Sequence, residues 1–191
     1  LNHLPEHVQP VAEEVLGHRT QMIECFRSLL SRSIVAQRIR CHGDYHLGQV
    51  LYTGKDFIVL DFEGEPTRSL AERRLKRSPL FDVAGMLRSF HYCSRVGQAN
   101  VAKRGLGNPE DAPALSAAAR LWYLATSANF IQAYLEVGAG SDFLPKSRED
   151  IERLLQVYLV EKACYELRYE LNNRPDWVEV PMQGILELGA A

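Results

Sequence analysis

The sequence predicts one mostly α-helical domain that carries a single small β-hairpin. Three observations support this fold class. Apolar residues recur at three- and four-residue steps over several long stretches, which is typical of helices packed on a core. Two short apolar runs, 50–52 and 57–60, are separated by a Gly-containing turn, as in a hairpin. The length of 191 residues suits one domain with its own core.

The first element is expected to be a long helix over residues 5–31. Its apolar stripe comprises Val8, Val11, Val15, Met22, Ile23, Phe26, Leu29 and Leu30. Pro5 suits a first helical turn, whereas Pro10 marks either the true start of the helix or a kink. A short strand over residues 38–41 is expected next.

Three more long helices are expected in the remainder of the chain. The first opens at Pro79, and its buried side comprises Leu80, Val83, Ala84, Met86, Leu87 and Phe90. Residues 97–113 are rich in Gly and Pro and predict an exposed loop. A second helix spans 114–137. The third begins at a capping-box pattern, Ser147-Arg148-Glu149-Asp150, and runs to about Asn172.

Composition excludes several classes of function. The net charge of −2 gives no basic surface for nucleic acid and no polybasic patch for a membrane. No apolar run is long enough to span a bilayer, and no secretory signal pattern is visible. The four cysteines are scattered without a C-x-x-C pair, which is typical of reduced thiols. We therefore expect a cytoplasmic protein that binds neither nucleic acid nor membranes.

Residues 42–64 contain the strongest candidate for catalytic chemistry. They read HGDYHLGQ, then the expected hairpin, then DFEG. Phosphoryl transfer needs a carboxylate for the acceptor hydroxyl and oxygen ligands for magnesium on the nucleotide, and protein kinases supply them as D-x-x-x-x-N, a hairpin and D-F-G. By this pattern Asp44 is the catalytic base, and Gln49 and Asp61 are the magnesium ligands. Glu63 is either a further ligand or holds a water.

Neighbouring positions refine this interpretation. Gly43 stands where many protein kinases carry an Arg, which favours a small-molecule kinase. We interpret His42 as a support of the loop, whereas His46 either contacts substrate or stabilises the loop. The basic run within 65–79 is either a solvated surface or lies near phosphates. A lone HGD is weak by itself, because Gly-Asp is also common in turns.

Four stretches carry a family resemblance: HGDYHLGQVL, VLDFEGEP, RSPLFDVAGMLRSF and YELRYELNNRPDW. They resemble the maltokinases, which are relatives of the aminoglycoside and choline phosphotransferases, and the resemblance runs from about residue 38 to the C-terminus. It implies ATP- and Mg²⁺-dependent phosphorylation of maltose, by a type of kinase often fused to a trehalose synthase. Residues 1–191 would be one kinase-like C-terminal lobe, with a catalytic loop at 42–49 and a metal-binding turn at 61–64.

The same resemblance raises two further expectations. No Gly-rich loop or lysine-bearing strand precedes residue 42, so the N-terminal, nucleotide-gripping lobe is expected to be missing from this chain. An acidic residue at the place of Asp82 would accept backbone N–H groups from the catalytic loop. The alternative is a first-turn acid that is favoured by the helix dipole.

The acceptor site is expected on the last long helix. Its polar and aromatic residues fall largely at three- and four-residue steps and share one flank: Lys162, Tyr165, Glu166, Tyr169 and Glu170. Such a flank suits a sugar, although it is also typical of an ordinary salt-bridged surface.

Two other functions remain open at this point. One is a kinase for an amino alcohol or an aminoglycoside, for which only Glu166 and Glu170 supply acidic groups. The other is a non-catalytic kinase-like module that holds sugar or docks on a trehalose synthase.

Overall fold

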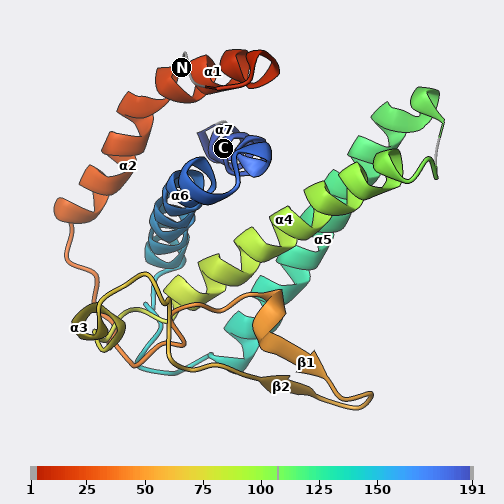
Figure 1. The fold of residues 1–191 in the computed structure, drawn as a ribbon. Helices are drawn as coiled ribbons and strands as arrows, with labels where there is room; N and C mark the ends of the chain where they lie inside the picture. The colour runs from red at the N-terminus through yellow and green to blue at the C-terminus, as the bar shows by residue number, and fades with distance from the viewer. Residues whose placement is uncertain (1–3, 107, 190–191) are drawn as a thin grey trace.

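The computed structural model describes residues 4–106 and 108–189 (Figure 1). Within them the chain is mostly helical, as the sequence predicted. The helices are α1 (Gln9–Gly17), α2 (Arg19–Leu30), α3 (Leu70–Arg73), α4 (Leu80–Lys103), α5 (Ala112–Val137), α6 (Arg148–Asn173) and α7 (Glu179–Gly189). Short 3₁₀ turns occur at Glu6–Val8, Leu47–Gln49, Pro109–Asp111 and Pro175–Trp177. No helix of the described residues is both long and apolar enough to cross a membrane.

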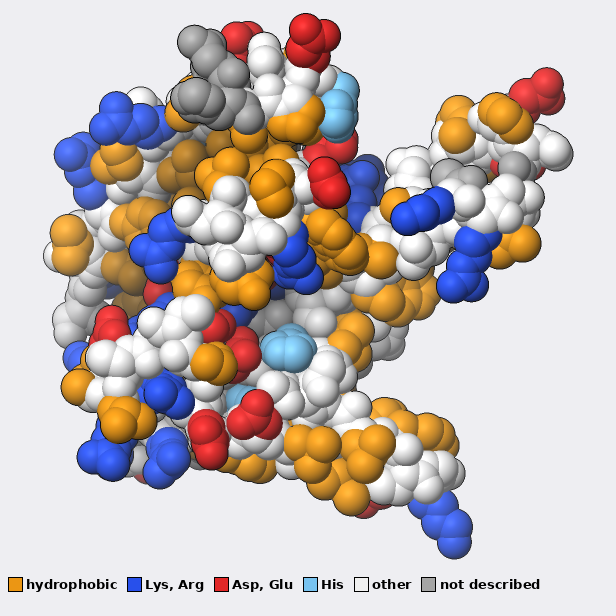
Figure 2. Space-filling view, in the orientation of Figure 1, with side chains coloured by type: hydrophobic (Ala, Val, Ile, Leu, Met, Phe, Trp, Pro, Cys, Tyr) orange, Lys and Arg blue, Asp and Glu red, His pale blue; other side chains and the backbone are white. Residues whose placement is uncertain are grey.

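The expected hairpin is confirmed as strands β1 (Val50–Tyr52) and β2 (Phe57–Val59). They pair antiparallel, with Leu51 opposite Ile58, and Gly54 in the turn has a φ of 91°. The hairpin extends away from the helices, and apolar side chains cover much of its visible surface (Figures 1 and 2). Its two faces are therefore largely exposed in the part of the chain described here.

Helix α4 lies at the centre of the helical body, packed against both α5 and α6. The stripe predicted from residues 80–90 is buried, and it joins Leu144 and Leu154 in one core. A second core forms where α1 and α7 pack against the C-terminal half of α6. Helix α4 also contacts the 3₁₀ turn at Leu47–Gln49, which lies in the loop predicted to be catalytic.

The prediction of one long helix over 5–31 is wrong. The chain forms a 3₁₀ turn, then α1, and bends at His18 into α2. Pro10 lies in the first turn of α1, where its missing N–H is tolerated. The bend lets α1 pack on α7 while α2 runs along α6. Apolar spacing continues through Gly17–His18, so periodicity alone did not reveal the break.

Three smaller expectations are also corrected. Residues 38–41 contain only an isolated bridge, Ile39 with Arg77, and no strand. The expected loop over 97–113 is shorter, because α4 continues to Lys103 and α5 begins at Ala112. Ser147 occupies the N-cap position of α6, but its side chain makes no capping hydrogen bond.

Candidate active site

The backbone of loop 42–49 is held on helix α4 by a half-buried carboxylate. Asp82 accepts hydrogen bonds from the backbone N–H of His42 (2.7 Å) and from that of Gly43 (2.9 Å). Burial raises the pKa of Asp82, although these two N–H groups oppose the rise. They are the hydrogen bonds expected of a residue that supports the loop.

Two further residues of α4 contact the same loop, and sequence reasoning missed both. Ser89 accepts a hydrogen bond from the backbone N–H of Leu47 at 3.0 Å. A Cβ at Gly85 would lie 2.7 Å from the carbonyl oxygen of Tyr45, so the loop passes directly over this glycine. The available signal was spacing, because Asp82, Gly85 and Ser89 fall three and four residues apart on one face of a helix.

His42 joins the loop to the segment that enters Asp61. Its Nε2 donates to the carbonyl of Leu60 (2.7 Å), and its Nδ1 accepts from the backbone N–H of Asp44 (3.3 Å). The ring is buried and lies 5.0 Å, centroid to centroid, from that of Phe62. Both ring nitrogens are engaged, which suits a neutral imidazole with a structural role.

Asp44 lies between two basic side chains from different parts of the chain. Its Oδ1 is 3.4 Å from Nζ of Lys162, and its Oδ2 is 3.7 Å from Nε2 of His46. Burial alone would raise the pKa of Asp44, but the His46 contact and the Lys162 charge outweigh it and hold the pKa below its usual range. An ionised carboxylate can accept a proton from a bound hydroxyl.

Gln49 and Asp61 come together at the open end of the hairpin. The Gln49 amide nitrogen donates to Oδ2 of Asp61 at 3.0 Å, and rotating the terminal amide by half a turn would present its oxygen instead. The backbone of Asp61 has a φ of 59°, so this residue adopts the left-handed conformation, which is uncommon outside glycine. An amide oxygen and a carboxylate are the hard ligands that Mg²⁺ accepts. Glu63 is exposed, and its carbonyl accepts a hydrogen bond from Arg73.

The residues described contain no cluster of three or more His, Cys, Asp and Glu side chains placed to hold a metal ion. A magnesium ion at Gln49 and Asp61 would therefore need further ligands from outside this pair. Mg²⁺ commonly keeps waters and takes substrate phosphates as ligands, so the donor pair remains compatible with it.

A pocket of about 440 Å³ brings Asp44 together with the predicted acceptor residues. Its lining residues are Asp44, His46, Glu65, Pro66, Gly85, Ser89, Tyr92, Lys162, Tyr165, Glu166, Tyr169, Glu170 and Arg174. Figure 2 shows acidic and histidine side chains gathered where the hairpin meets the helical body. Sequence reasoning did not name Glu65, Tyr92 or Arg174 as site residues. Glu65 directly follows the DFEG turn, Arg174 lies within the stretch YELRYELNNRPDW, and Tyr92 carries no motif.

The predicted acceptor residues on α6 make different hydrogen bonds with the rest of the protein. Glu170 is buried, and it accepts hydrogen bonds from Arg174 (2.6 and 2.8 Å) and from the Tyr92 hydroxyl (3.2 Å). The hydroxyl of Tyr165 lies 2.7 Å from that of Thr67, and burial raises the pKa of Tyr165 to about 12. These contacts fix the wall of the pocket before any ligand arrives.

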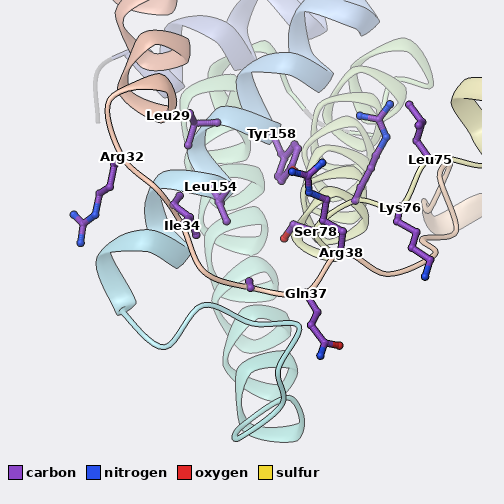
Figure 3. Close-up of a pocket in the computed structure, with 12 residues that line it drawn as sticks. Leu29, Arg32, Ile34, Gln37, Arg38, Leu75, Lys76, Ser78, Leu154 and Tyr158 are labelled. Carbon is purple, nitrogen blue, oxygen red and sulfur yellow. The ribbon is translucent and has the colours of Figure 1, made fainter.

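The basic run after residue 65 is partly structural. Arg68 lies 3.3 Å from Glu161 on α6, and the guanidinium of Arg77 stacks 5.2 Å from the Phe81 ring centre. A second pocket of about 390 Å³ lies beside Arg77, and Leu29, Ile34 and Leu154 form part of its wall (Figure 3). Its lining includes none of the site residues predicted from the sequence.

The chain is similar in sequence to glucosamine kinases. It is 30% identical over 152 residues to the glucosamine kinase of Streptacidiphilus jiangxiensis, which covers 78% of this chain and 31% of that protein. It is 31% identical over 176 residues to that of Mycolicibacterium smegmatis, covering 90% of this chain and 39% of that protein. The chain thus spans about a third to two fifths of these relatives. No protein-family model matches it.

Solved structures agree with the sequence comparison. One crystal form of a glucosamine kinase superposes with a TM-score of 0.76 at 25% identity, over 95% of this chain and 40% of that one. A glucosamine kinase in complex with glucosamine, ADP and inorganic phosphate shares the fold, with a TM-score of 0.69 at 23% identity, over 94% and 39% of the two chains. The homologues are sugar kinases, and they are named for glucosamine rather than for maltose.

Proposed function

We propose that this chain is the acceptor- and metal-binding lobe of an ATP-dependent sugar kinase. One observation carries the proposal: Asp44 lies against Lys162 and His46 in a pocket that also contains every residue proposed to bind the acceptor. The similarity to glucosamine kinases supports the same reaction class. Residues 1–191 act as one kinase-like lobe, and another part of a longer protein supplies the groups that grip the nucleotide.

The residues divide the chemistry between them. Asp44 orients the acceptor hydroxyl and takes its proton in the transition state. The contacts with His46 and Lys162 lower the pKa of Asp44 against the effect of burial, which favours the ionised form that this role needs. Asp82 and Ser89 hold loop 42–49 against α4 by hydrogen bonds, and Gly85 allows the loop backbone to approach the helix closely. Gln49 and Asp61 would hold Mg²⁺, which neutralises charge on the nucleotide phosphates when it is bound.

We propose an amino sugar of the glucosamine type as the acceptor. The lining holds four carboxylates, Asp44, Glu65, Glu166 and Glu170, and two Lys and Arg side chains, Lys162 and Arg174. Arg88, which does not line the pocket, pairs with Glu166, so the carboxylates exceed these cations by one. This excess of acidic groups favours a cationic acceptor over a neutral one. Maltose, which the sequence resemblance implied, is the alternative, and the relatives named above give no support for a trehalose synthase partner.

The test uses the full-length protein with ATP and Mg²⁺ and measures ADP release with glucosamine, glucose and maltose. We expect turnover with glucosamine to exceed that with maltose. Asp44→Asn should lower turnover by about 10²–10⁴-fold, because it removes the base while keeping the shape. Asp142→Asn, on an exposed loop, is the matched control. Normal turnover in Asp44→Asn would remove this residue from catalysis, and no turnover of any sugar by the wild-type protein would refute the proposed function.

A further inference from the structure

Arg88 is a buried cation that sits behind the wall of the acceptor pocket. It lies on α4 with its side chain only 2% exposed, and its Nε donates to Oε2 of Glu166 on α6 at 2.8 Å. Its guanidinium also lies 5.8 Å from the ring centre of Tyr92. Glu166 and Tyr92 both line the pocket, whereas Arg88 does not. Arg88 thus contacts two residues of the pocket wall without lining the pocket itself.

The third helix at this junction leaves room for the guanidinium only because Gly184 lacks a side chain. A Cβ at Gly184 on α7 would lie 2.0 Å from Nη1 of Arg88 and 2.7 Å from its Cζ. Both distances are far below ordinary van der Waals contact, so Arg88 and the α7 backbone touch directly. Nη2 of Arg88 is buried and has no hydrogen-bond partner within the described residues. The guanidinium is therefore positioned by Glu166 and by the surface of α7.

A buried charge pair of this kind has a predictable effect on the pocket. A carboxylate that pairs with a fixed, buried guanidinium has little freedom to rotate or to follow solvent. A second pair repeats the arrangement one turn along, where Tyr92 of α4 donates to Glu170 of α6. Residues 88 and 92 of α4 thereby hold residues 166 and 170 of α6, four positions apart on each helix.

We propose that Arg88 is a specificity-determining positioning residue, which fixes the Glu166 carboxylate in the acceptor pocket and is itself set by the close approach of α7 at Gly184. The proposal rests on the proposed function, because Glu166 must face an acceptor for its placement to matter. It follows that a change on α7, outside the pocket, alters acceptor recognition through Arg88.

The test compares Arg88→Lys, Gly184→Ala and the control Gly97→Ala in the full-length protein. A Cβ at Gly97 on α4 meets nothing within 4 Å. We expect Arg88→Lys and Gly184→Ala each to raise the KM for glucosamine by about tenfold, the usual value of one hydrogen bond to a charged group. The KM for ATP should stay close to the wild-type value, and Gly97→Ala should change neither constant. Calorimetric titration with glucosamine, without nucleotide, should show the same loss of affinity.

A double-mutant cycle separates positioning from general stability. Arg88→Lys combined with Glu166→Gln should cost less acceptor affinity than the sum of the two single changes, because both remove the same interaction. With an active wild-type protein, equal effects on both KM values, additive effects, or a lower melting temperature as the only change would overturn the inference. Failure of both Arg88→Lys and Gly184→Ala to fold would assign Arg88 to stability alone. A wild-type protein that phosphorylates no sugar would instead refute the proposed function, and this inference with it.

Discussion

Replacing Gly85 by alanine should displace loop 42–49, the proposed catalytic loop, without removing any polar group. The new Cβ would lie 2.7 Å from the Tyr45 carbonyl oxygen, whereas ordinary contact begins at 3.4 Å, so the two must separate by 3.4 − 2.7 = 0.7 Å. Tyr45 directly follows Asp44, and the loop is tied to α4 on both sides by Asp82 and Ser89. The loop therefore has little freedom to absorb this shift.

The expected cost falls on both turnover and stability. Misplacing a reacting group by about 1 Å can cost about 10²-fold in rate, so we expect kcat to fall by about 10- to 100-fold. Overpacking a core typically costs about 1–3 kcal/mol, so the free energy of unfolding should fall within that range. Steady-state kinetics of the full-length protein and urea unfolding measure the two effects.

Gly97→Ala is the matched control for this change, because it makes the same substitution on the same helix in open space. It should leave kcat unchanged and stabilise the helix by up to about 1 kcal/mol, the usual difference between Gly and Ala in a helix. A wild-type kcat in Gly85→Ala would show that the contact between Gly85 and the Tyr45 carbonyl does not set the position of the loop, and it would refute this reasoning.

Three further predictions follow from the same structure. Asp61→Ala should abolish the magnesium dependence of nucleotide binding in the full-length protein, as measured by titration of Mg²⁺, since it removes the charged ligand; an unchanged titration curve would exclude Asp61 from the metal site. Asp82→Ala should lower stability by about 1–3 kcal/mol and lower kcat as well, because two N–H groups lose their acceptor; a variant with normal melting and turnover would contradict this. Burial lowers the pKa of His91 below its ordinary 6.5, although Glu187 opposes this shift. Burial would raise the pKa of Glu187, but its contacts with His91 and Arg95 outweigh burial and lower this pKa from 4.5 to about 2. The unfolded chain then binds more protons than the folded one, so stability should fall as the pH drops below 6.5, and fall again between 4.5 and 2; a urea midpoint that stays constant from pH 7 to pH 3 would count against it.

Local sequence order was sufficient for much of the fold and for the core of the candidate site. Apolar periodicity identified the buried side of α4, and the turn chemistry around Gly54 identified the hairpin. The spacing of Asp44, Gln49 and Asp61 predicted a catalytic base and two magnesium ligands. The side chains of the two predicted ligands, Gln49 and Asp61, lie 3.0 Å apart. These features depend on neighbours within about twenty residues, so the sequence expresses them directly.

Residues that meet from distant parts of the chain were decided only by the tertiary structure. Lys162 reaches Asp44 across 118 positions and Arg88 reaches Glu166 across 78, and neither pairing has a local signature. The helix expected over 5–31 divides at His18 because α1 and α2 pack on different partners, which periodicity does not encode. The requirement for glycine at position 184 also appears only when α7 packs against α4, because the guanidinium of Arg88 then occupies the space that a Cβ would need.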